Sequence, residues 1–279
     1  MHTHRYLLCL LPLLPLAVSA QSPWPRTKAG FYAQASFQAI PAYHTVFDDD
    51  NGSAELGRPL SEYGVQLYGE YGLSTRTTLV AALPFRMQQS GTARLSAWPT
   101  TEGSLAGIGN ASLSLRHNFA KGSMPLTATL RVDLPTNDND LETGLRAGYN
   151  AFTFLPTFST GKGYGKWYWF GYGGYGIRTN DYSHFIDAGA EAGYHFPGFW
   201  LMAFSEWVLP LDNGDLNLGQ NNELTRLYVN NQGFGSIGVK TLVAFNRFWG
   251  LTASAAGAAW GRNVPARPAF SGGVYFKWD

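Results

Sequence analysis

The chain has 279 residues and a single cysteine, Cys9. This cysteine lies in an apolar stretch that follows Arg5 and ends at the small residues Ser19 and Ala20. A basic start, a short hydrophobic run and a small-residue site are typical of a secretory signal peptide, so we predict a signal at residues 1–20, cut after Ala20. The remaining domain, residues 21–279, has no cysteine, which excludes disulfides and thiolate metal sites.

Charge is also scarce. Asp, Glu, Lys and Arg make up 14% of the sequence, against roughly 25% in soluble domains. The signal peptide removes one of the 20 basic residues, which leaves 19 against 19 acidic residues. A neutral chain lacks the basic footprint of a nucleic-acid-binding protein, so we expect no nucleic-acid partner.

After the signal, no stretch is apolar and long enough for a membrane-spanning helix.

Aromatic residues and glycine are plentiful, at 15% of the chain and 33 residues, and apolar and polar residues alternate in many segments. After Asn110, for example, Leu113 and Leu115 alternate with Ser114 and Arg116. Successive side chains of a strand point to opposite faces, so this alternation predicts β-strands. About twelve such segments are expected, near residues 29–40, 62–73, 76–87, 108–119, 125–134, 145–158, 166–178, 185–196, 199–209, 233–245, 249–260 and 268–278.

The predicted connections alternate between short and long. The short links are 74–75, 120–124, 159–165, 197–198 and 246–248, and the other set is 41–61, 88–107, 135–144, 179–184, 210–232 and 261–267. Bacterial outer-membrane barrels have short periplasmic turns and longer outer loops. We therefore predict an all-β fold, a transmembrane antiparallel up-and-down β-barrel of about 12 strands, in one domain in the bacterial outer membrane. Closure follows from the hydrocarbon core, where an open sheet edge has no hydrogen-bond partners.

The two faces of the strands are expected to meet different surroundings. Leu113, Leu115 and Phe119 should face lipid, while charged residues take the opposite parity and should face the lumen. Aromatic residues gather towards segment ends, where interfacial girdles lie. The chain ends on Trp278 and Asp279, an imperfect version of the terminal aromatic strand that the barrel-assembly machinery reads. Outer-membrane lipid and this machinery are the expected partners.

Charged residues of lumen parity are the candidate site, either as a selective constriction or as an ion-pair network that satisfies the interior. Three arginines project from neighbouring strands near two carboxylates. Three further carboxylates lie on adjoining strands, and neutralisation by arginine is expected for them rather than acid–base catalysis. The lumen-lining and selectivity candidates are Glu70, Arg86, Arg116, Arg131, Asp133, Asp187, Glu191, Glu206 and Lys240.

Four histidines outside the signal fall on different segments, so neither a metal site nor a cofactor is expected. Outer-membrane phospholipases are also barrels of about twelve strands, with a serine and histidine pair near the outer leaflet. His117 is predicted on the periplasmic side, and Ser183–His184 at the outer rim has no assignable acidic or amide partner. A membrane-embedded lipid hydrolase therefore stays an alternative, as does a non-conducting structural or adhesion barrel.

Short motifs resemble a known family. These are Tyr71–Thr77 leading into Leu83-Pro84, then Gly107–Arg116, then Val132–Thr136 followed by Gly144. Over roughly residues 63–160 the chain resembles the outer-membrane family linked to phenol meta-degradation pathways, although Asn110 and Asn137 stand where that family has Asp and Gly. The resemblance implies a barrel that passes small hydrophobic or aromatic compounds. The combined prediction is a passive pore for small solutes.

Overall fold

In the computed structural model, the described residues are 21–48, 52–94, 98–120 and 122–278, so the predicted signal peptide lies outside them. They are organised in fourteen strands and one short helix. The elements are β1 (Phe31–Phe47), β2 (Ser53–Gly72), β3 (Thr77–Ser90), β4 (Gly103–Ile108), β5 (Ser112–Ala120), β6 (Leu126–Asp133), β7 (Thr153–Tyr164), β8 (Trp167–Arg178), β9 (Phe185–Phe196), β10 (Phe199–Pro210), α1 (Gln220–Thr225), β11 (Gly233–Ala244), β12 (Trp249–Arg262), β13 (Val264–Pro265) and β14 (Ala269–Trp278).

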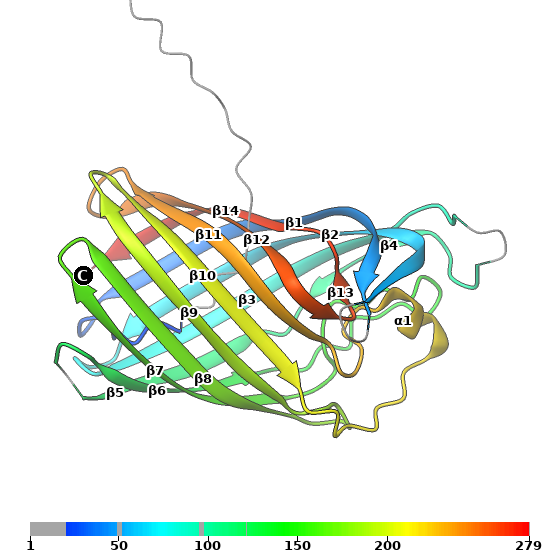
Figure 1. The fold of residues 1–279 in the computed structure, drawn as a ribbon, viewed down its shortest axis with the longest axis horizontal. Coiled ribbons are helices and arrows are strands. Elements are labelled where there is room, and N and C mark those ends of the chain that lie inside the picture. The colour runs from blue at the N-terminus through cyan, green and yellow to red at the C-terminus, as the bar shows by residue number, and fades with distance from the viewer. Residues whose placement is uncertain (1–20, 49–51, 95–97, 121, 279) are drawn as a thin grey trace, which may run out of the picture.

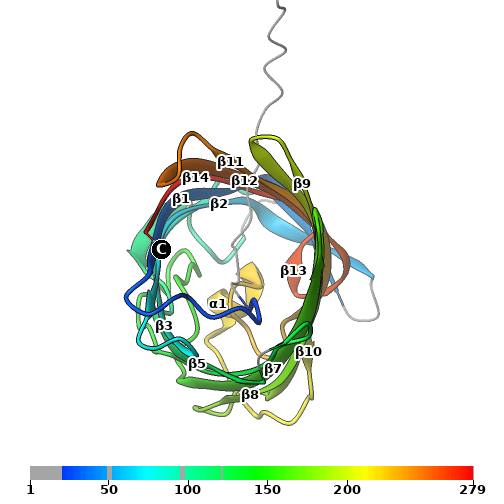
Figure 2. The ribbon, with the colours of Figure 1, turned by 90° about the vertical axis from the view of Figure 1, so that its left-hand side faces the viewer.

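Twelve strands form one closed antiparallel barrel, which confirms the predicted fold (Figures 1 and 2). Neighbours along the chain pair with each other, and β1 closes the sheet by pairing with β2 on one side and β14 on the other. Phe31, for instance, is opposite Tyr71 of β2 and Trp278 of β14. Closure gives each barrel strand two partners, which is the condition that a hydrocarbon environment imposes on backbone amides.

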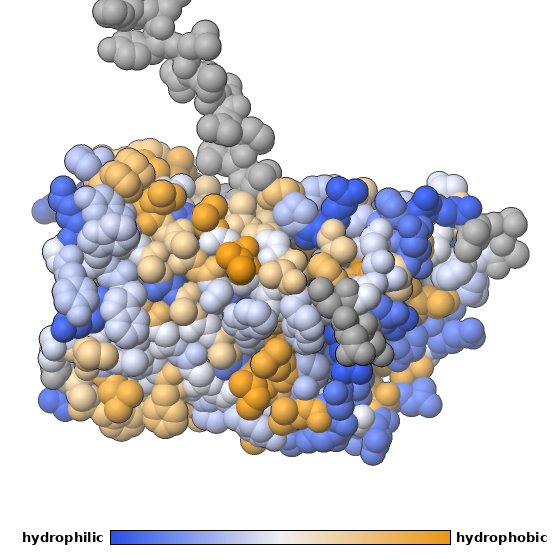
Figure 3. All heavy atoms as spheres, in the orientation of Figure 1, coloured by the Kyte–Doolittle hydropathy of each residue, from blue (hydrophilic) through white to orange (hydrophobic). Residues whose placement is uncertain are grey.

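The outer surface of the barrel is apolar and the inner surface is polar. Leu113 and Leu115 are 55% and 47% exposed on the outside, whereas the next residue, Arg116, points to the opposite face and is 1% exposed. Hydrophobic residues are spread over the strand-bearing part in Figure 3, and hydrophilic residues gather at the end with the long loops. No helix in the described ranges has the length and hydrophobicity of a membrane-spanning helix.

Some predicted boundaries were wrong. β1 and β2 continue to Phe47 and from Ser53, so most of the predicted loop 41–61 is strand. The cause is a small apolar core beyond the barrel wall, in which Tyr43, Leu60 and Leu145 pack together. The outer halves of these two strands are buried against a loop. The alternation of apolar and polar residues that the membrane imposes therefore stops before the strands themselves end.

The predicted strand 145–158 also needs correction. Residues 145–152 belong to a loop, and β7 runs from Thr153 to Tyr164, so the predicted link 159–165 is mostly strand. β4 and β13 occur inside the predicted loops 88–107 and 261–267, pairing with β3 and β1 respectively. α1 lies in the predicted loop 210–232. These short elements form on the outer side, where contacts between loops decide the conformation.

Candidate functional site

The first described residues cross the barrel at the end with short turns, which is the periplasmic end in the predicted orientation. Figure 2 looks into this end and shows the blue N-terminal segment lying across the opening. Three contacts hold it: Gln21 Nε2 donates to Asp187 Oδ2 (3.2 Å), Thr127 Oγ1 donates to the carbonyl of Pro23 (2.6 Å), and Arg26 Nε pairs with Glu70 Oε2 (2.5 Å). We call residues 21–30 the N-terminal segment.

Trp24 of the N-terminal segment lies edge-on to Tyr168 and Phe170 on β8, with ring centroids 5.8 Å and 6.0 Å apart. Beside it is a cavity of about 280 Å³, which we call the inner cavity. Its charged lining residues are Arg26, Glu70, Glu191 and Lys240. The segment therefore divides the lower lumen rather than hanging outside it.

The opposite end of the barrel is covered by two loops, 134–152 and 211–232, which we call the outer cap. Leu145, Ala147 and Ala151 of the first loop are 0%, 1% and 0% exposed, and Leu227 and Val229 of the second are 4% and 2% exposed. Apolar burial of this extent keeps the loops folded against the barrel end instead of extended into solvent. Solutes entering from this side must pass the outer cap.

Two of the motifs that carry the family resemblance meet beneath the outer cap. Asn110 Nδ2 donates to the carbonyls of Leu134 (2.8 Å) and Tyr149 (2.7 Å), and Asn110 Oδ1 accepts from Tyr149 N (2.8 Å). Thr136 Oγ1 also donates to the carbonyl of Ile108 (2.8 Å). These contacts turn the loop inwards and place Tyr149 in the lumen. An amide at position 110 can both donate and accept, which a carboxylate cannot.

Gly144 joins the two loops of the outer cap. Its φ is +76°, and a Cβ there would lie 2.2 Å from the carbonyl oxygen of Asn221. Its own carbonyl accepts from Asn222 Nδ2 (3.1 Å) and Thr225 Oγ1 (2.9 Å), at α1. A side chain at position 144 is incompatible with both the backbone angle and the space.

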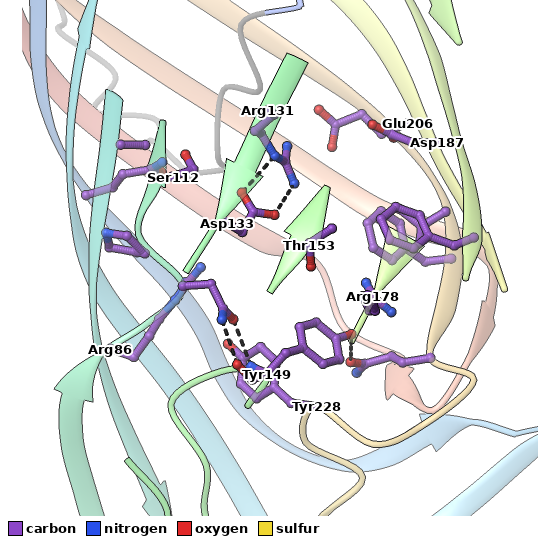
Figure 4. Close-up of a pocket in the computed structure, with 18 of the residues that line it drawn as sticks. Arg86, Ser112, Arg131, Asp133, Tyr149, Thr153, Arg178, Asp187, Glu206 and Tyr228 are labelled. Atoms are coloured by element: carbon purple, nitrogen blue, oxygen red, sulfur yellow. Dashed lines mark hydrogen bonds and ion pairs between the residues drawn. The ribbon is translucent and has the colours of Figure 1, made fainter. Parts of the chain in front are cut away.

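Between the outer cap and the N-terminal segment lies a cavity of about 370 Å³, which we call the chamber (Figure 4). It has no lining residue in common with the inner cavity among the residues described. Its lining is both charged and aromatic. The charged members are Arg86, Arg131, Asp133, Arg178, Asp187 and Glu206, and the aromatic ones are Tyr149, Tyr172, Phe185, Tyr228 and Phe234.

Tyr149 and Tyr228 of the outer cap form one wall of the chamber, which we call the aromatic wall. The rings of Tyr182 and Tyr228 lie edge-on to Tyr149, with centroids 5.3 Å and 5.1 Å away, and Tyr149 donates its hydroxyl to Gln232 Oε1 (2.6 Å). Burial raises the pKa of Tyr149, and it raises the pKa of Tyr228 to about 12. Both side chains are therefore neutral hydrogen-bonding groups around neutral pH.

The structure divides the predicted site residues into three groups. Arg86, Arg131, Asp133, Asp187 and Glu206 line the chamber. Glu70, Glu191 and Lys240 line the inner cavity. Arg116 lines neither cavity, because it is 1% exposed and pairs with Glu70.

Ion pairs bind several of these residues, as one of the two sequence interpretations proposed. Arg131 Nε lies 2.9 Å from Asp133 Oδ1, Arg116 Nη2 lies 3.4 Å from Glu70 Oε1, and Lys240 pairs with Glu191. Glu70 additionally accepts from Tyr68 OH (2.5 Å). A buried pair of this kind is not a large net source of stability, but removal of one partner leaves an expensive unpaired charge.

Sequence analysis missed the N-terminal segment and the aromatic wall as parts of the site. Gln21 and Trp24 precede the first predicted strand and carry no periodic signal. Tyr149 fell inside a predicted strand, although it is on a loop. Arg178 was predicted to face the lumen but not to belong to the site. The alternation of side chains along the strand could have identified that arginine. No local sequence feature pointed to Gln21, Trp24 or Tyr149.

The histidines show no hydrolase arrangement in the part of the chain described. His117 Nδ1 lies 3.0 Å from Thr77 Oγ1, and His184 Nδ1 lies 3.0 Å from the hydroxyl of Tyr175. Ser183 hydrogen-bonds to Asn231 rather than to a histidine. Within the described ranges, no group of three or more His, Cys, Asp or Glu side chains is placed to hold a metal ion.

Comparison with known proteins gives structural matches only. No family model and no curated protein sequence matches the chain. A solved outer membrane channel from Pseudomonas putida F1 has a TM-score of 0.71 at 16% identity, over 94% of this chain and 100% of that one. The NanC porin gives 0.55 at 6% identity over 89% and 100% of the two chains, and the beta domain of the Bordetella autotransporter BrkA gives 0.53 at 12% over 90% and 100%.

These matches agree with the barrel that the motif resemblance implied. At such low identities they establish the fold and no more. Two of the three are named as a channel or a porin and the third as an autotransporter domain. The chain has the fold of the outer-membrane β-barrels.

Proposed function

We propose that the protein is a passive channel for small solutes in the bacterial outer membrane. The observation that carries this proposal is the chamber, a polar and aromatic cavity of about 370 Å³ inside a closed barrel. Binding cavities of roughly 300–1,000 Å³ are typical for small molecules. The apolar exterior fits the lipid of that membrane, and the terminal strand is the part expected to contact the barrel-assembly machinery.

Two features restrict what passes. The outer cap closes the loop end and the N-terminal segment crosses the other end, so the passage admits small molecules rather than extended polymers. The lining residues Arg86, Arg131, Asp133, Asp187, Glu206, Glu70, Glu191 and Lys240 are proposed to shape the field along the path. The aromatic wall around Tyr149 supports solutes with a hydrophobic or aromatic part.

The alternatives have less support. A lipid hydrolase needs an activated nucleophile, and the two candidate histidines, His117 and His184, contact a threonine and a tyrosine instead of a serine. A non-conducting structural or adhesion barrel does not require a chamber with charged walls. Passive conduction accounts for both the cavity and its lining.

Planar-bilayer recording of the refolded protein, with swelling of loaded liposomes in small solutes, tests the proposal. We expect discrete unitary currents in KCl and swelling that falls as solute size rises. Absence of both would contradict it. Release of fatty acid from phospholipid vesicles, lost on changing His184→Ala or His117→Ala, would support the hydrolase instead.

A further inference from the structure

We infer that the chamber binds the carboxylate group of a small aromatic acid, and that Arg178 holds this group. The inference rests on the proposed channel function and names its solute class. Arg178 is the last residue of β8, at the loop end of the barrel. Its side chain lies beside the aromatic wall of the chamber in Figure 4.

The guanidinium of Arg178 lies close to two aromatic rings. Its Cζ is 4.1 Å from the ring centroid of Tyr149 and 4.2 Å from that of Phe185. These two cation–π contacts hold the guanidinium at the wall of the chamber, and among the described residues no carboxylate lies within ion-pair distance of it. Its Nε is buried and has no hydrogen-bond partner among the described residues. A planar guanidinium held in place in this way can donate two parallel hydrogen bonds to a carboxylate.

Most other lumen cations already have a carboxylate. Arg26 and Arg116 share Glu70, Arg131 has Asp133, and Lys240 has Glu191. Among the described residues, Arg178 forms no ion pair with any carboxylate within 4.0 Å. Arg178 is half-buried, and a half-buried cation without a carboxylate partner attracts an anion because burial of an unpaired charge is costly. An anionic solute would supply the missing charge.

Two more cations near the aromatic wall also lack a carboxylate partner among the described residues. Arg146 donates from Nη1 to the carbonyl of Tyr228 (2.9 Å) and from Nη2 to Tyr182 OH (2.9 Å). Arg86 donates from Nη1 to Gln38 Oε1 (3.0 Å) and lines the chamber. All three acceptors are neutral, so these two arginines keep their positive charge beside the aromatic wall.

The carboxylates around this region have other contacts. Glu62 accepts from Tyr43 OH (2.8 Å), Asp187 accepts from Gln21 (3.2 Å), and Asp133 is bound to Arg131. Asp187 is opposite Gly174, four residues before Arg178 on β8. Four residues of strand amount to about 13 Å. Asp187 is near enough to interact with the charge of Arg178, but it forms no ion pair with the guanidinium within 4.0 Å, so the guanidinium can still bind an anion.

The rest of the solute is defined by the rings and by the size of the chamber. Tyr149, Tyr228 and Phe234 offer aromatic surface in the same cavity of about 370 Å³ that Arg178 lines. A neutral hydrocarbon would pack against the rings but would offer Arg178 no hydrogen-bond acceptor. An aromatic monocarboxylate packs against the rings and also accepts hydrogen bonds from Arg178, which distinguishes it from uncharged aromatic compounds.

The test compares three ring compounds as blockers of the KCl current through single channels, namely benzoate, benzyl alcohol and benzylammonium. We expect benzoate to block, and the other two to act at least tenfold more weakly, a preference that corresponds to about 1.4 kcal/mol. R178Q should raise the half-blocking concentration of benzoate about tenfold, and R178K should give an intermediate value because lysine keeps the charge without the planar fork. R247Q removes the same charge from an exposed turn outside the chamber and should leave the half-blocking concentration of benzoate at the wild-type value.

The outcomes separate this inference from the channel proposal. Normal KCl current with no effect of benzoate, or equal block in wild type and R178Q, would overturn the carboxylate site and leave the channel intact. If the wild type carries no current, saturation-transfer NMR of benzoate with the folded protein in detergent decides whether the site exists, and no transfer overturns it. Circular dichroism checks that each variant has folded. If R178Q does not fold, R178K is compared with the wild type in its place.

Discussion

At the scale of single residues, the structure separates charges that hold the barrel together from charges that face a passage. Arg116 is the clearest case, because sequence parity predicted it as a selectivity residue. It is 1% exposed and paired with Glu70, and it lines neither cavity. We therefore expect a change at Arg116 to affect stability, while ion preference responds to the chamber residues Arg131, Asp133 and Asp187.

Removal of Glu70 tests this division. E70Q leaves Arg116 and Arg26 without their shared carboxylate, and breaking a buried pair in this way costs about 3–5 kcal/mol. Urea unfolding of the protein folded in lipid should show a free energy of unfolding reduced by this amount. E55Q is the matched control, since Glu55 pairs with Arg94 at the surface, where their side chains are 67% and 49% exposed. That pair is worth about 0–1 kcal/mol, and an equal loss in both variants would refute the interpretation.

A single lipid-facing residue tests the orientation of the strands. Leu115 of β5 is opposite Leu79 and Leu130, and all three belong to the apolar exterior. L115R should lower the free energy of unfolding in lipid by about 2–4 kcal/mol, the cost of a cation at the bilayer midplane. T75R, in an exposed turn, should cost far less. An L115R protein as stable as the wild type would mean that this face does not meet hydrocarbon.

At the scale of elements, the N-terminal segment is the structure's main departure from a simple pore. It is held by Gln21, Pro23 and Arg26 through contacts to β9, β6 and β2. Its sequence gives no sign of this role, because a segment with irregular backbone shows no regular spacing of apolar residues. The partners are up to 166 residues away, so only the closed barrel brings them together.

Deletion of residues 21–25 is expected to increase conductance. The change removes Trp24 and the contacts to Asp187 and Thr127, and it merges the space beside the segment with the chamber. Pore width limits ion flow, so single-channel current in KCl should be larger and W24A should show part of the increase. K28Q, at the exposed end of the segment, should match wild type. Unchanged current after the deletion would show that the segment lies outside the ion path.

Strand periods predicted the barrel strands well and the outer cap poorly, for a physical reason. Within the membrane, lipid on one side and polar side chains on the other impose alternation on each strand. Beyond it, β1, β2 and the loop at 134–152 bury one another around Tyr43 and Leu145. Alternation there follows loop packing, so the predicted ends at residues 41, 61 and 145 were wrong.

At the scale of the whole molecule, charge differs between the two ends. The described parts of the short-turn end carry Arg26, Lys28, Arg76, Lys166 and Arg247 with no acidic residue. The described loops and α1 at the other end carry nine acidic residues, Asp48, Glu102, Asp138, Asp140, Glu142, Asp181, Asp212, Asp215 and Glu223, against the basic residues Arg94, Arg146, Arg226 and Arg267. A channel with opposite charge at its two mouths has an axial field.

This asymmetry predicts a rectified current. The current should be larger when the loop side is positive, because that polarity drives cations in from the acidic end and anions in from the basic end. Rectification should be strong near 0.1 M salt and weak at 1 M, where the Debye length falls from about 10 Å to about 3 Å. Bilayer recordings with the protein inserted from one side measure it, and combined neutralisation of Arg76, Lys166 and Arg247 should reduce it. A symmetric current at low salt would contradict the prediction.

The sequence by itself determined that the strands form a closed barrel and which side of each strand faces lipid. Both follow from local alternation and from the need to pair every backbone amide in hydrocarbon. Only the tertiary structure decided which lumen charges meet, which segments cover the two ends of the barrel and why Arg178 differs from the other arginines. Asn110 fixes Tyr149 from 39 residues away, and such contacts exist only after closure has set the distances between strands.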